Sequence, residues 1–297
     1  MKTCLHFACL IIVLTMATFL CASAGGVQAQ LQSVVLVDDN FDETTPGWGV
    51  DHFATIQDGV DAVDPGGTVE VAEGVYAEQV VIAKDLTLQG DHKKSVINQV
   101  DDMLPCFDNF FGSTSPLICI KGSVTVTVDG FTLAWGGWDY PESSYAGIGI
   151  SNIGESRENH DPFVEIANNT IILPYYFEFN NDGTVGIEAN SGYGPDDLAL
   201  NIHHNIIQGY DNALEFNQCD PISEECASGT FASIEVTSNN LYENRSGFTL
   251  SVGFPTSPEI HFNRIFSTIS DPKYGAIIPP LAEGVVVNAE YNWWGCN

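Results

Sequence analysis

The chain has 297 residues, enough for one large domain with its own core. Lysine and arginine together number 9 against 39 aspartates and glutamates, which gives a formal net charge of −30 at pH 7. This balance excludes a nucleic-acid-binding protein, because phosphate binding needs a basic surface. It also disfavours acidic polysaccharides as partners, unless a divalent cation lies between the two negative charges.

The first residues are typical of a secretory signal peptide. Lys2 precedes an apolar run from Leu10 to Leu20, and small residues follow. Cleavage is expected after Ala24, with Ala29 as the alternative, so residues 1–24 are assigned to the signal peptide. The apolar run is too short for a membrane anchor. We therefore expect no membrane span and a secreted protein, extracellular or on the cell surface.

Five of the eight cysteines lie beyond this leader. Such cysteines suit disulfides in an oxidising compartment, and no Cys/His spacing typical of a metal site occurs. Two pairs of sequence neighbours are predicted to form disulfides, Cys106 with Cys119 and Cys219 with Cys226. Cys296 has no predicted partner, and a further C-terminal domain is one possible source of it.

The segment 53–90 predicts a helix followed by short strands. Apolar residues recur at helical spacing over 53–63. The turn Asp64-Pro65-Gly66-Gly67 ends the helix, because proline cannot donate a hydrogen bond and glycine admits positive φ. Three runs rich in β-branched residues follow, separated by turns at Gly74 and at Lys84-Asp85. These predicted strands are Thr68 to Val71, Gln79 to Ile82 and Leu86 to Gln89.

Four features resemble those of a known family: this helix, the D-P-G-G turn, the E-G-V-Y-x-E segment at 73–78 and the L-T-L-Q-G run at 86–90. They are similar to the N-terminal cap and first coil of the right-handed parallel β-helix proteins of the pectate-lyase-like superfamily, in the branch of the pectin methylesterases. The resemblance covers roughly residues 34–297. It implies an all-β, right-handed parallel β-helix solenoid with a short N-terminal capping helix. Because this fold serves lyases, hydrolases, esterases and inert surface proteins, the resemblance is specific for the fold only.

A repeated pattern supports the solenoid. Each repeat has two apolar residues at period two, then polar residues, then Gly or Asn, and successive repeats lie 40, 39, 36, 35, 23 and 29 residues apart. The shortest interval fits one coil, and the longer ones add an excursion. Gly and Asn tolerate the left-handed backbone of a sharp corner, and stacked Asn side chains can hydrogen-bond between coils. The corner residues are Gly90, Gly130, Asn169, Asn205, Asn240, Asn263 and Asn292.

The apolar residues of each repeat are expected to point inward and to form one continuous core column. We divide the chain into a signal peptide (1–24), an N-terminal strand at Val34 to Val37 with an acidic linker (25–52), and the β-helix domain (53–297). The inward residues are predicted to be Leu86, Leu88, Val126, Val128, Val164, Ile166, Leu200, Ile202, Ile234, Val236, Ile260, Phe262, Val285 and Val287.

Functional residues are expected in the excursions, which can vary without disturbing the coil. Aromatic rings beside carboxylates suit sugars, because rings stack on the apolar faces of pyranoses while acids accept hydrogen bonds from hydroxyl groups. The alternative is that the rings pack the loops against the coil. The substrate-binding candidates are Trp135, Trp138, Tyr140, Tyr175, Tyr176 and Tyr210.

Two carboxylates could also hydrolyse a glycoside, one as acid and the other as base or nucleophile. Asp139 and Glu178 each lie nine residues past their corner and form the candidate catalytic pair, with Asp211 as a third acid. However, the sequence lacks the Q-D-T-L, D-F-I-F-G and L-G-R-P-W segments of pectin methylesterases and the G-H-G and R-I-K segments of polygalacturonases. The absence of these motifs favours a protein without catalytic activity.

Calcium is the one cofactor that the sequence suggests. Asp38, Asn40 and Asp42 alternate as at the start of a calcium loop, but Glu43 stands where glycine is needed. The alternative is a solvated acidic turn. Among the histidines, His203 and His261 are expected two coils, about 10 Å, apart, too far to share a metal. His204 is expected to point to the other face of its strand.

Two hypotheses of function remain. The first is an exported, non-catalytic β-helix that binds a polysaccharide or cell-wall glycan or builds the cell surface. The second is a polysaccharide-degrading enzyme, a lyase or glycoside hydrolase, of the pectate-lyase-like group.

Overall fold

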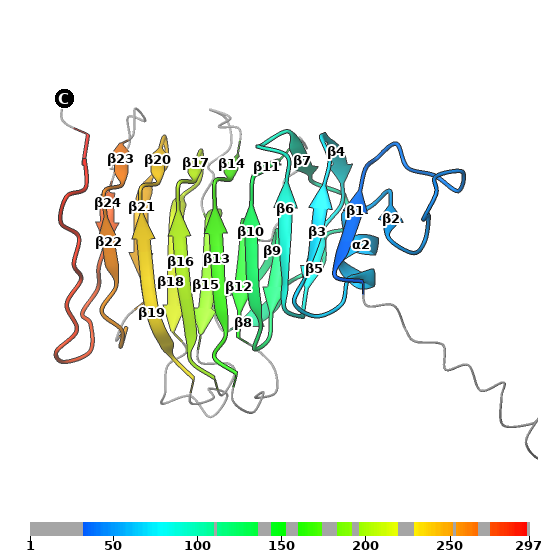
Figure 1. Cartoon of the computed structure of the whole chain (residues 1–297). Coiled ribbons are helices and arrows are strands. Elements are labelled where there is room, and N and C mark those ends of the chain that lie inside the picture. The colour runs from blue at the N-terminus through cyan, green and yellow to red at the C-terminus, as the bar shows by residue number, and fades with distance from the viewer. Residues whose placement is uncertain are drawn as a thin grey trace, which may run out of the picture. The chain divides into compact units, whose positions relative to one another are not determined.

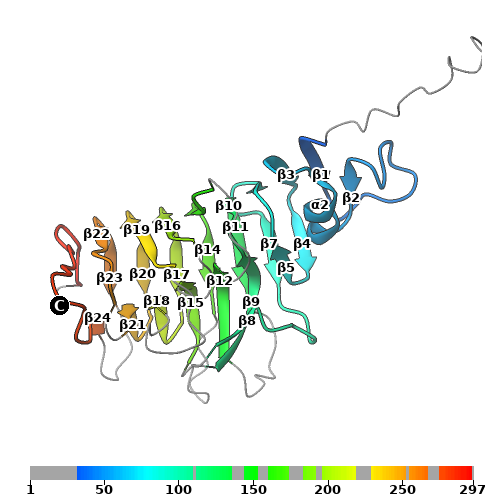
Figure 2. The same cartoon turned by 90° about the horizontal axis from the view of Figure 1, so that it is seen from below.

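The structure is a computed structural model that describes residues 32–109, 112–135, 144–152, 160–173, 183–191, 196–218, 229–251, 254–266 and 274–295. Its strands follow one another in a fixed order, from sheet A to sheet B to sheet C and then to the next coil, so that equivalent strands lie side by side along one axis (Figures 1 and 2). Each strand pairs in parallel with the strand one coil away, and in the described part only β8 pairs antiparallel.

Sheet A contains, in spatial order, β2 (His52–Phe53), β1 (Val34–Val37), β3 (Gly67–Val71), β6 (Leu86–Gly90), β10 (Thr125–Asp129), β13 (Phe163–Ala167), β16 (Leu198–His203), β19 (Phe231–Thr237) and β22 (Glu259–His261). Sheet B contains β4 (Gly74–Ala77), β7 (Ser95–Asn98), β11 (Phe131–Ala134), β14 (Thr170–Ile172), β17 (Ile206–Gln208), β20 (Asn240–Tyr242) and β23 (Arg264–Phe266). Sheet C contains β5 (Val80–Ile82), β9 (Gly112–Lys121), β12 (Ser144–Ser151), β15 (Val185–Ser191), β18 (Asn212–Gln218), β21 (Ser246–Leu250) and β24 (Tyr274–Ile277), and β8 (Phe107–Asn109) pairs with β9.

This arrangement is a right-handed parallel β-helix and confirms the predicted fold. Strands connected by one turn of chain around the axis pair in parallel, and such connections are right-handed in nearly all proteins. The predicted first strand is β1, and the predicted strand at 86–89 is β6. The prediction of a plain turn at Gly74 was wrong, because residues 74–77 form β4, which opens sheet B.

One helix, α2 (Ile56–Ala62), lies at the N-terminal end of the stack (Figure 1). Thr55 caps it, and the side chains of Ile56 and Val60 are buried against the first strands. Its first backbone N–H groups are bound by a residue that is distant in the sequence: Glu78 accepts hydrogen bonds from Ile56 N (2.8 Å) and Gln57 N (2.9 Å). The last residue of the E-G-V-Y-x-E segment therefore ties the helix to the first coil.

We expect the substitution Glu78→Ala to lower the free energy of unfolding by about 1–2 kcal/mol, because two N–H groups at a helix start lose a charged acceptor. Urea unfolding monitored by circular dichroism measures the change. Glu73→Ala is the matched control, since the Glu73–Lys94 ion pair is exposed and should contribute little to stability. Equal losses in both variants would contradict the capping role.

The core is one apolar column between the three sheets. The predicted inward residues from Leu86 to Val236, together with Ile260, are at most 3 % exposed. The prediction for Phe262 was wrong: it is 62 % exposed, because it lies at the corner after β22 with a φ of 57°. Positive φ turns the chain there, so the alternation of inward and outward side chains ends one residue earlier.

The predicted asparagine ladder lies at the corner between sheets A and B. From Asn205 onward, each ladder side chain accepts hydrogen bonds from the backbone N–H and the amide group of the asparagine one coil earlier; the first two contacts are Asn169 N to Asn205 Oδ1 and Asn205 N to Asn239 Oδ1, both 2.9 Å. The ladder residue of the fifth coil is Asn239, one residue before the predicted Asn240. The residue before each ladder asparagine has positive φ: Asn168, His204, Ser238, Phe262 and Tyr291.

Candidate functional site

The outer face of sheet C carries two rows of polar side chains on neighbouring strands. Parallel strands lie about 4.8 Å apart, so residues paired in register contact one another across the strands. Glu188 on β15 pairs with Glu215 on β18, and Asn190 pairs with Asn217 two residues further along. Core residues on either side of these positions point inward. The first row contains Cys119, Gly149, Glu188, Glu215 and Thr249, and the second contains Lys121, Ser151, Asn190 and Asn217.

Within each strand the amide binds the acid two residues before it. Asn190 Nδ2 donates to Glu188 Oε1 at 2.9 Å, and Asn217 Nδ2 donates to Glu215 Oε1 at 2.9 Å. Asn212 Nδ2 donates to the second oxygen of Glu215 at 2.8 Å. We call Glu188, Asn190, Glu215 and Asn217 the acid–amide quartet.

Glu188 is the group with the clearest electrostatic perturbation in the quartet. Its side chain is 4 % exposed, and burial raises its pKa to about 7, with the charge of Glu215 adding to the increase. Hydrogen bonds from Asn190, Thr114 and Asn217 oppose this increase in pKa but do not cancel it. Glu215 is only partly buried. The two acids therefore occupy different environments, in which Glu188 keeps its proton up to about pH 7.

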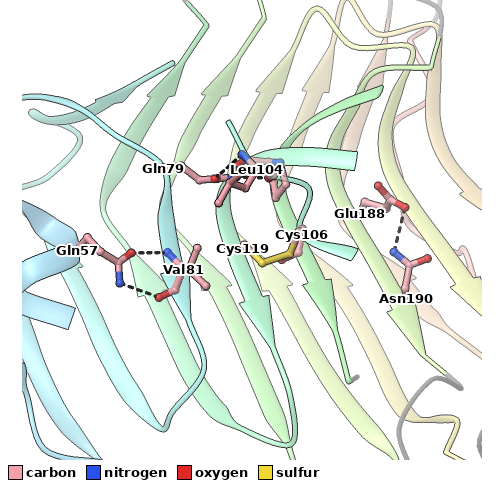
Figure 3. Close-up of a disulfide and its surroundings, with 10 residues drawn as sticks. Gln57, Gln79, Val81, Leu104, Cys106, Cys119, Glu188 and Asn190 are labelled. Atoms are coloured by element: carbon pink, nitrogen blue, oxygen red, sulfur yellow. Dashed lines mark hydrogen bonds between the residues drawn. A yellow bond between two sulfur atoms is a disulfide. The ribbon is translucent and has the colours of Figure 1, made fainter. Parts of the chain in front are cut away.

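A disulfide fixes one end of the first row. Cys106 and Cys119 are joined, with Cα atoms 5.5 Å apart, which confirms the predicted pair. Gly149 lies between Cys119 and Glu188 in the row. Figure 3 shows the disulfide at β9 and the Glu188–Asn190 hydrogen bond on β15, which is separated from β9 by β12 in the same sheet. The disulfide thus holds the segment before β8 beside the strands that carry the quartet.

Two predicted sugar-binding residues are part of the core. Trp135 is 3 % exposed and packs edge-on against Tyr145 with ring centroids 4.6 Å apart, and Tyr210 is 1 % exposed. Neither ring presents a face to a ligand, so we assign both to packing. Four further candidates lie outside the described residues: Trp138, Tyr140, Tyr175 and Tyr176.

Of the three predicted acids, Asp211 alone lies in the described part of the chain. Asp139 and Glu178 lie outside the described residues, as do Cys219, Cys226 and Cys296. Asp211 accepts from Arg245 Nη1 at 3.1 Å and from the backbone of Gly183 at 3.2 Å, so it fixes the corner before β18.

The predicted calcium residues form a hydrogen-bonded turn. Asp38 Oδ1 accepts from the backbone and side chain of Asn40 at 2.9 and 2.8 Å, and Asp42 Oδ1 accepts from the backbone and hydroxyl of Thr44. Asp38 also lines a pocket of about 530 Å³ together with Glu73. Among the described residues, no group of three or more His, Cys, Asp or Glu side chains is placed to hold a metal ion.

The quartet was not predicted as a site, although the sequence contains a signal for it. Ile187-Glu188-Ala189-Asn190 and Leu214-Glu215-Phe216-Asn217 repeat the pattern apolar-Glu-apolar-Asn. Between apolar residues that point inward, the acid and the amide must both point outward. The recurrence of this pattern in two successive sheet C strands predicts the quartet once the strands are identified.

Comparisons with known proteins add little. No family model matches the sequence, and no curated protein matches it. Two solved structures of a pectin methylesterase from Aspergillus niger, one deglycosylated and one penultimately deglycosylated, are similar over 91 % of this chain and 92 % of theirs. The identities are 13 and 14 % and the TM-scores 0.31 and 0.28. Values this low say nothing about what this chain does. In the described part of the chain, no helix is long and apolar enough to cross a membrane.

Proposed function

We propose that this protein is an exported β-helix that binds a polysaccharide on the outer face of sheet C, at the acid–amide quartet. The observation that carries the proposal is the buried Glu188 carboxyl group beside Glu215, each with its own asparagine two residues along the strand. The leader-like first residues and the disulfide support export, since disulfides persist in oxidising compartments.

The quartet suits hydroxyl groups, which both donate and accept hydrogen bonds. Glu188, 4 % exposed, can donate one through its proton, and the partly exposed Glu215 carboxyl group accepts. Asn190 and Asn217 are 0 and 7 % exposed, so their role is to fix the two acids. Polar groups of this kind, spaced by about 4.8 Å along successive strands, give an elongated ligand repeated contacts. The net charge of −30 favours a neutral polymer over a uronate polymer.

Cleavage of the same polymer is the second candidate function, and the raised pKa of Glu188 favours it. A carboxyl group that stays protonated near neutral pH can protonate a glycosidic oxygen, while a neighbouring carboxylate acts as base or nucleophile. Glu188 and Glu215 start from paired positions on strands about 4.8 Å apart, and retaining glycosidases use two carboxyl groups separated by about 5 Å. In this alternative Glu188 is the acid and Glu215 the base or nucleophile.

The test is size-exclusion chromatography of the protein after incubation with neutral and acidic polysaccharides, with calcium and with chelator. We expect a neutral polymer to co-elute with the wild-type protein, and Glu188→Ala or Glu215→Gln to weaken this binding at least tenfold. Glu235→Gln is the matched control, because Glu235 is exposed on the outer face of sheet A.

Each outcome decides between the candidates. Intact polymer bound by the wild type and by the Glu235 variant, but not by the quartet variants, supports a binding protein. Shortened polymer, with no shortening in the two quartet variants, supports the enzyme. Equal binding by all variants, or no binding at all, rejects the quartet as the site.

A further inference from the structure

Two consecutive histidines lie in contact at the corner after β16. The rings of His203 and His204 meet edge to face, and their Nδ1 atoms are 2.9 Å apart. The expectation that His204 points to the other face was wrong. Its φ of 58° turns the chain at the corner, so these two side chains lie on the same side.

The His203 ring nitrogen that does not contact His204, Nε2, is bound by a carboxylate. His203 Nε2 lies 3.1 Å from Glu165 Oε1 on the neighbouring strand β13. Glu165 is itself held, since Asn201 Nδ2 donates to it at 3.3 Å. With Nε2 carrying the proton that Glu165 accepts, the Nδ1 lone pair of His203 faces His204. A carboxylate on the far nitrogen is the usual outer partner of a metal-binding histidine.

The backbone that carries the pair is rigid. Ile202 and Asn205, on either side of the two histidines, are 0 and 1 % exposed, and Asn205 belongs to the asparagine ladder. His204 itself is exposed, and 23 % of the His203 side chain is accessible. Both rings therefore reach solvent, and only the exposed ring of His204 has to rotate for the two Nδ1 atoms to point at one ion.

We propose that His203 and His204 bind a divalent transition-metal ion of the zinc, nickel and copper class through their Nδ1 atoms, with Glu165 as a positioning residue. Two imidazole nitrogens bound to one metal ion at about 2.0–2.1 Å lie about 2.9–3.4 Å apart, as the angle at the metal goes from square to tetrahedral. The observed 2.9 Å lies in this range. The ion replaces the proton shared by the two nitrogens, His204 carries its proton on Nε2, and water fills the other positions.

The chain contains a matched site without the second histidine. His261 occupies the position of His203 two coils later; its Nε2 lies 2.7 Å from Glu259 Oε2 on the same strand, and its Nδ1 lies 3.2 Å from the backbone oxygen of Glu290. The corner residue that follows is Phe262 instead of His204, and it stacks on Tyr291 with centroids 5.5 Å apart. A histidine bound to a carboxylate through Nε2 thus exists at both coils, with the acid on the neighbouring strand at His203 and on the same strand at His261, and only His203 has a second histidine beside it.

The test is calorimetric titration of untagged protein with copper(II) and with zinc chloride, together with electron paramagnetic resonance of the copper form. We expect one ion per chain, a resonance signal from two imidazole nitrogens, and at least tenfold weaker binding in His203→Ala and His204→Ala. Glu165→Gln should weaken binding about tenfold, as outer-shell substitutions commonly do, and His261→Ala should leave the affinity unchanged.

The variant Phe262→His is the decisive addition, because it places a second imidazole beside His261; a metal ion that replaces the contact of His261 Nδ1 with Glu290 O should then raise the stoichiometry to two ions. This variant gains metal binding, and a gain of binding cannot be caused by misfolding. Unchanged affinity in His203→Ala and His204→Ala, or no binding by the wild type up to millimolar metal, would overturn the proposal.

Discussion

Replacing Asn205 with alanine is expected to lower the free energy of unfolding by about 3–5 kcal/mol, because several buried polar groups lose their partners at once. The Asn205 amide donates to Ile166 O at 2.8 Å and to Asn239 Oδ1 at 3.0 Å. Its oxygen accepts from the backbone N–H of Asn169 at 2.9 Å. Asn205 is 1 % exposed, so water does not replace these bonds without a rearrangement of the corner.

Urea unfolding followed by fluorescence measures this loss. The matched control is Asn201→Ala on the outer face of the same strand, where the side chain is partly exposed and its bond to Glu165 is 3.3 Å long. We expect that control to lose less than about 1 kcal/mol. A loss in Asn205→Ala no larger than in the control would mean that the ladder is not a main source of stability.

Replacing Glu188 with glutamine is expected to make the protein more stable than the wild type above pH 7 and to change little at pH 4.5. The pKa of Glu188 is about 7 in the folded protein against an ordinary value of 4.5. The folded state therefore holds its proton more tightly than the unfolded state does, and wild-type stability falls as pH rises from 4.5 to 7. Glutamine resembles the protonated acid and does not titrate, so the difference should reach about 3 kcal/mol at pH 8.

Thermal and urea unfolding at pH 4.5, 6 and 8 test this prediction, with the comparison made between variant and wild type at each pH. Glu235→Gln again provides the control, because that exposed side chain should show no such trend. If the stability difference between Glu188→Gln and the wild type does not change with pH, the carboxyl group of Glu188 is not held neutral by burial.

Much of the fold could be predicted from the sequence, because the determining signals are local. The period-two apolar pairs define the sheet A strands, and the asparagine corners define where each coil turns. The errors have the same physical origin. Asn240 was chosen over Asn239, and Phe262 was placed inside, because one residue with positive φ shifts the alternation without a marker in the sequence. At that position the structure accepts Asn, His, Ser, Phe and Tyr alike.

The candidate site was harder to predict, because it depends on register between strands that are 27 residues apart in the chain, as Glu188 and Glu215 are. The excursions differ in length, so no fixed offset aligns the sheet C strands. Aromatic residues after the corners are the stronger signal in the sequence, but two of them, Trp135 and Tyr210, are buried. The contact between His203 and His204 likewise depends on one backbone angle.

The stacking of coils also has a mechanical consequence. The hydrogen bonds between coils run along the axis of the helix, whereas the covalent chain winds around it. A tension applied along that axis loads the bonds of the outermost coil first, so the coils should peel off in series at low force instead of resisting together. Ladder residues from Asn169 to Asn292 lie 36, 34, 24 and 29 residues apart. Each coil released would lengthen the molecule by about 80–130 Å. The protein would thus extend in steps, and the length of each step would follow from the number of residues between successive ladder asparagines.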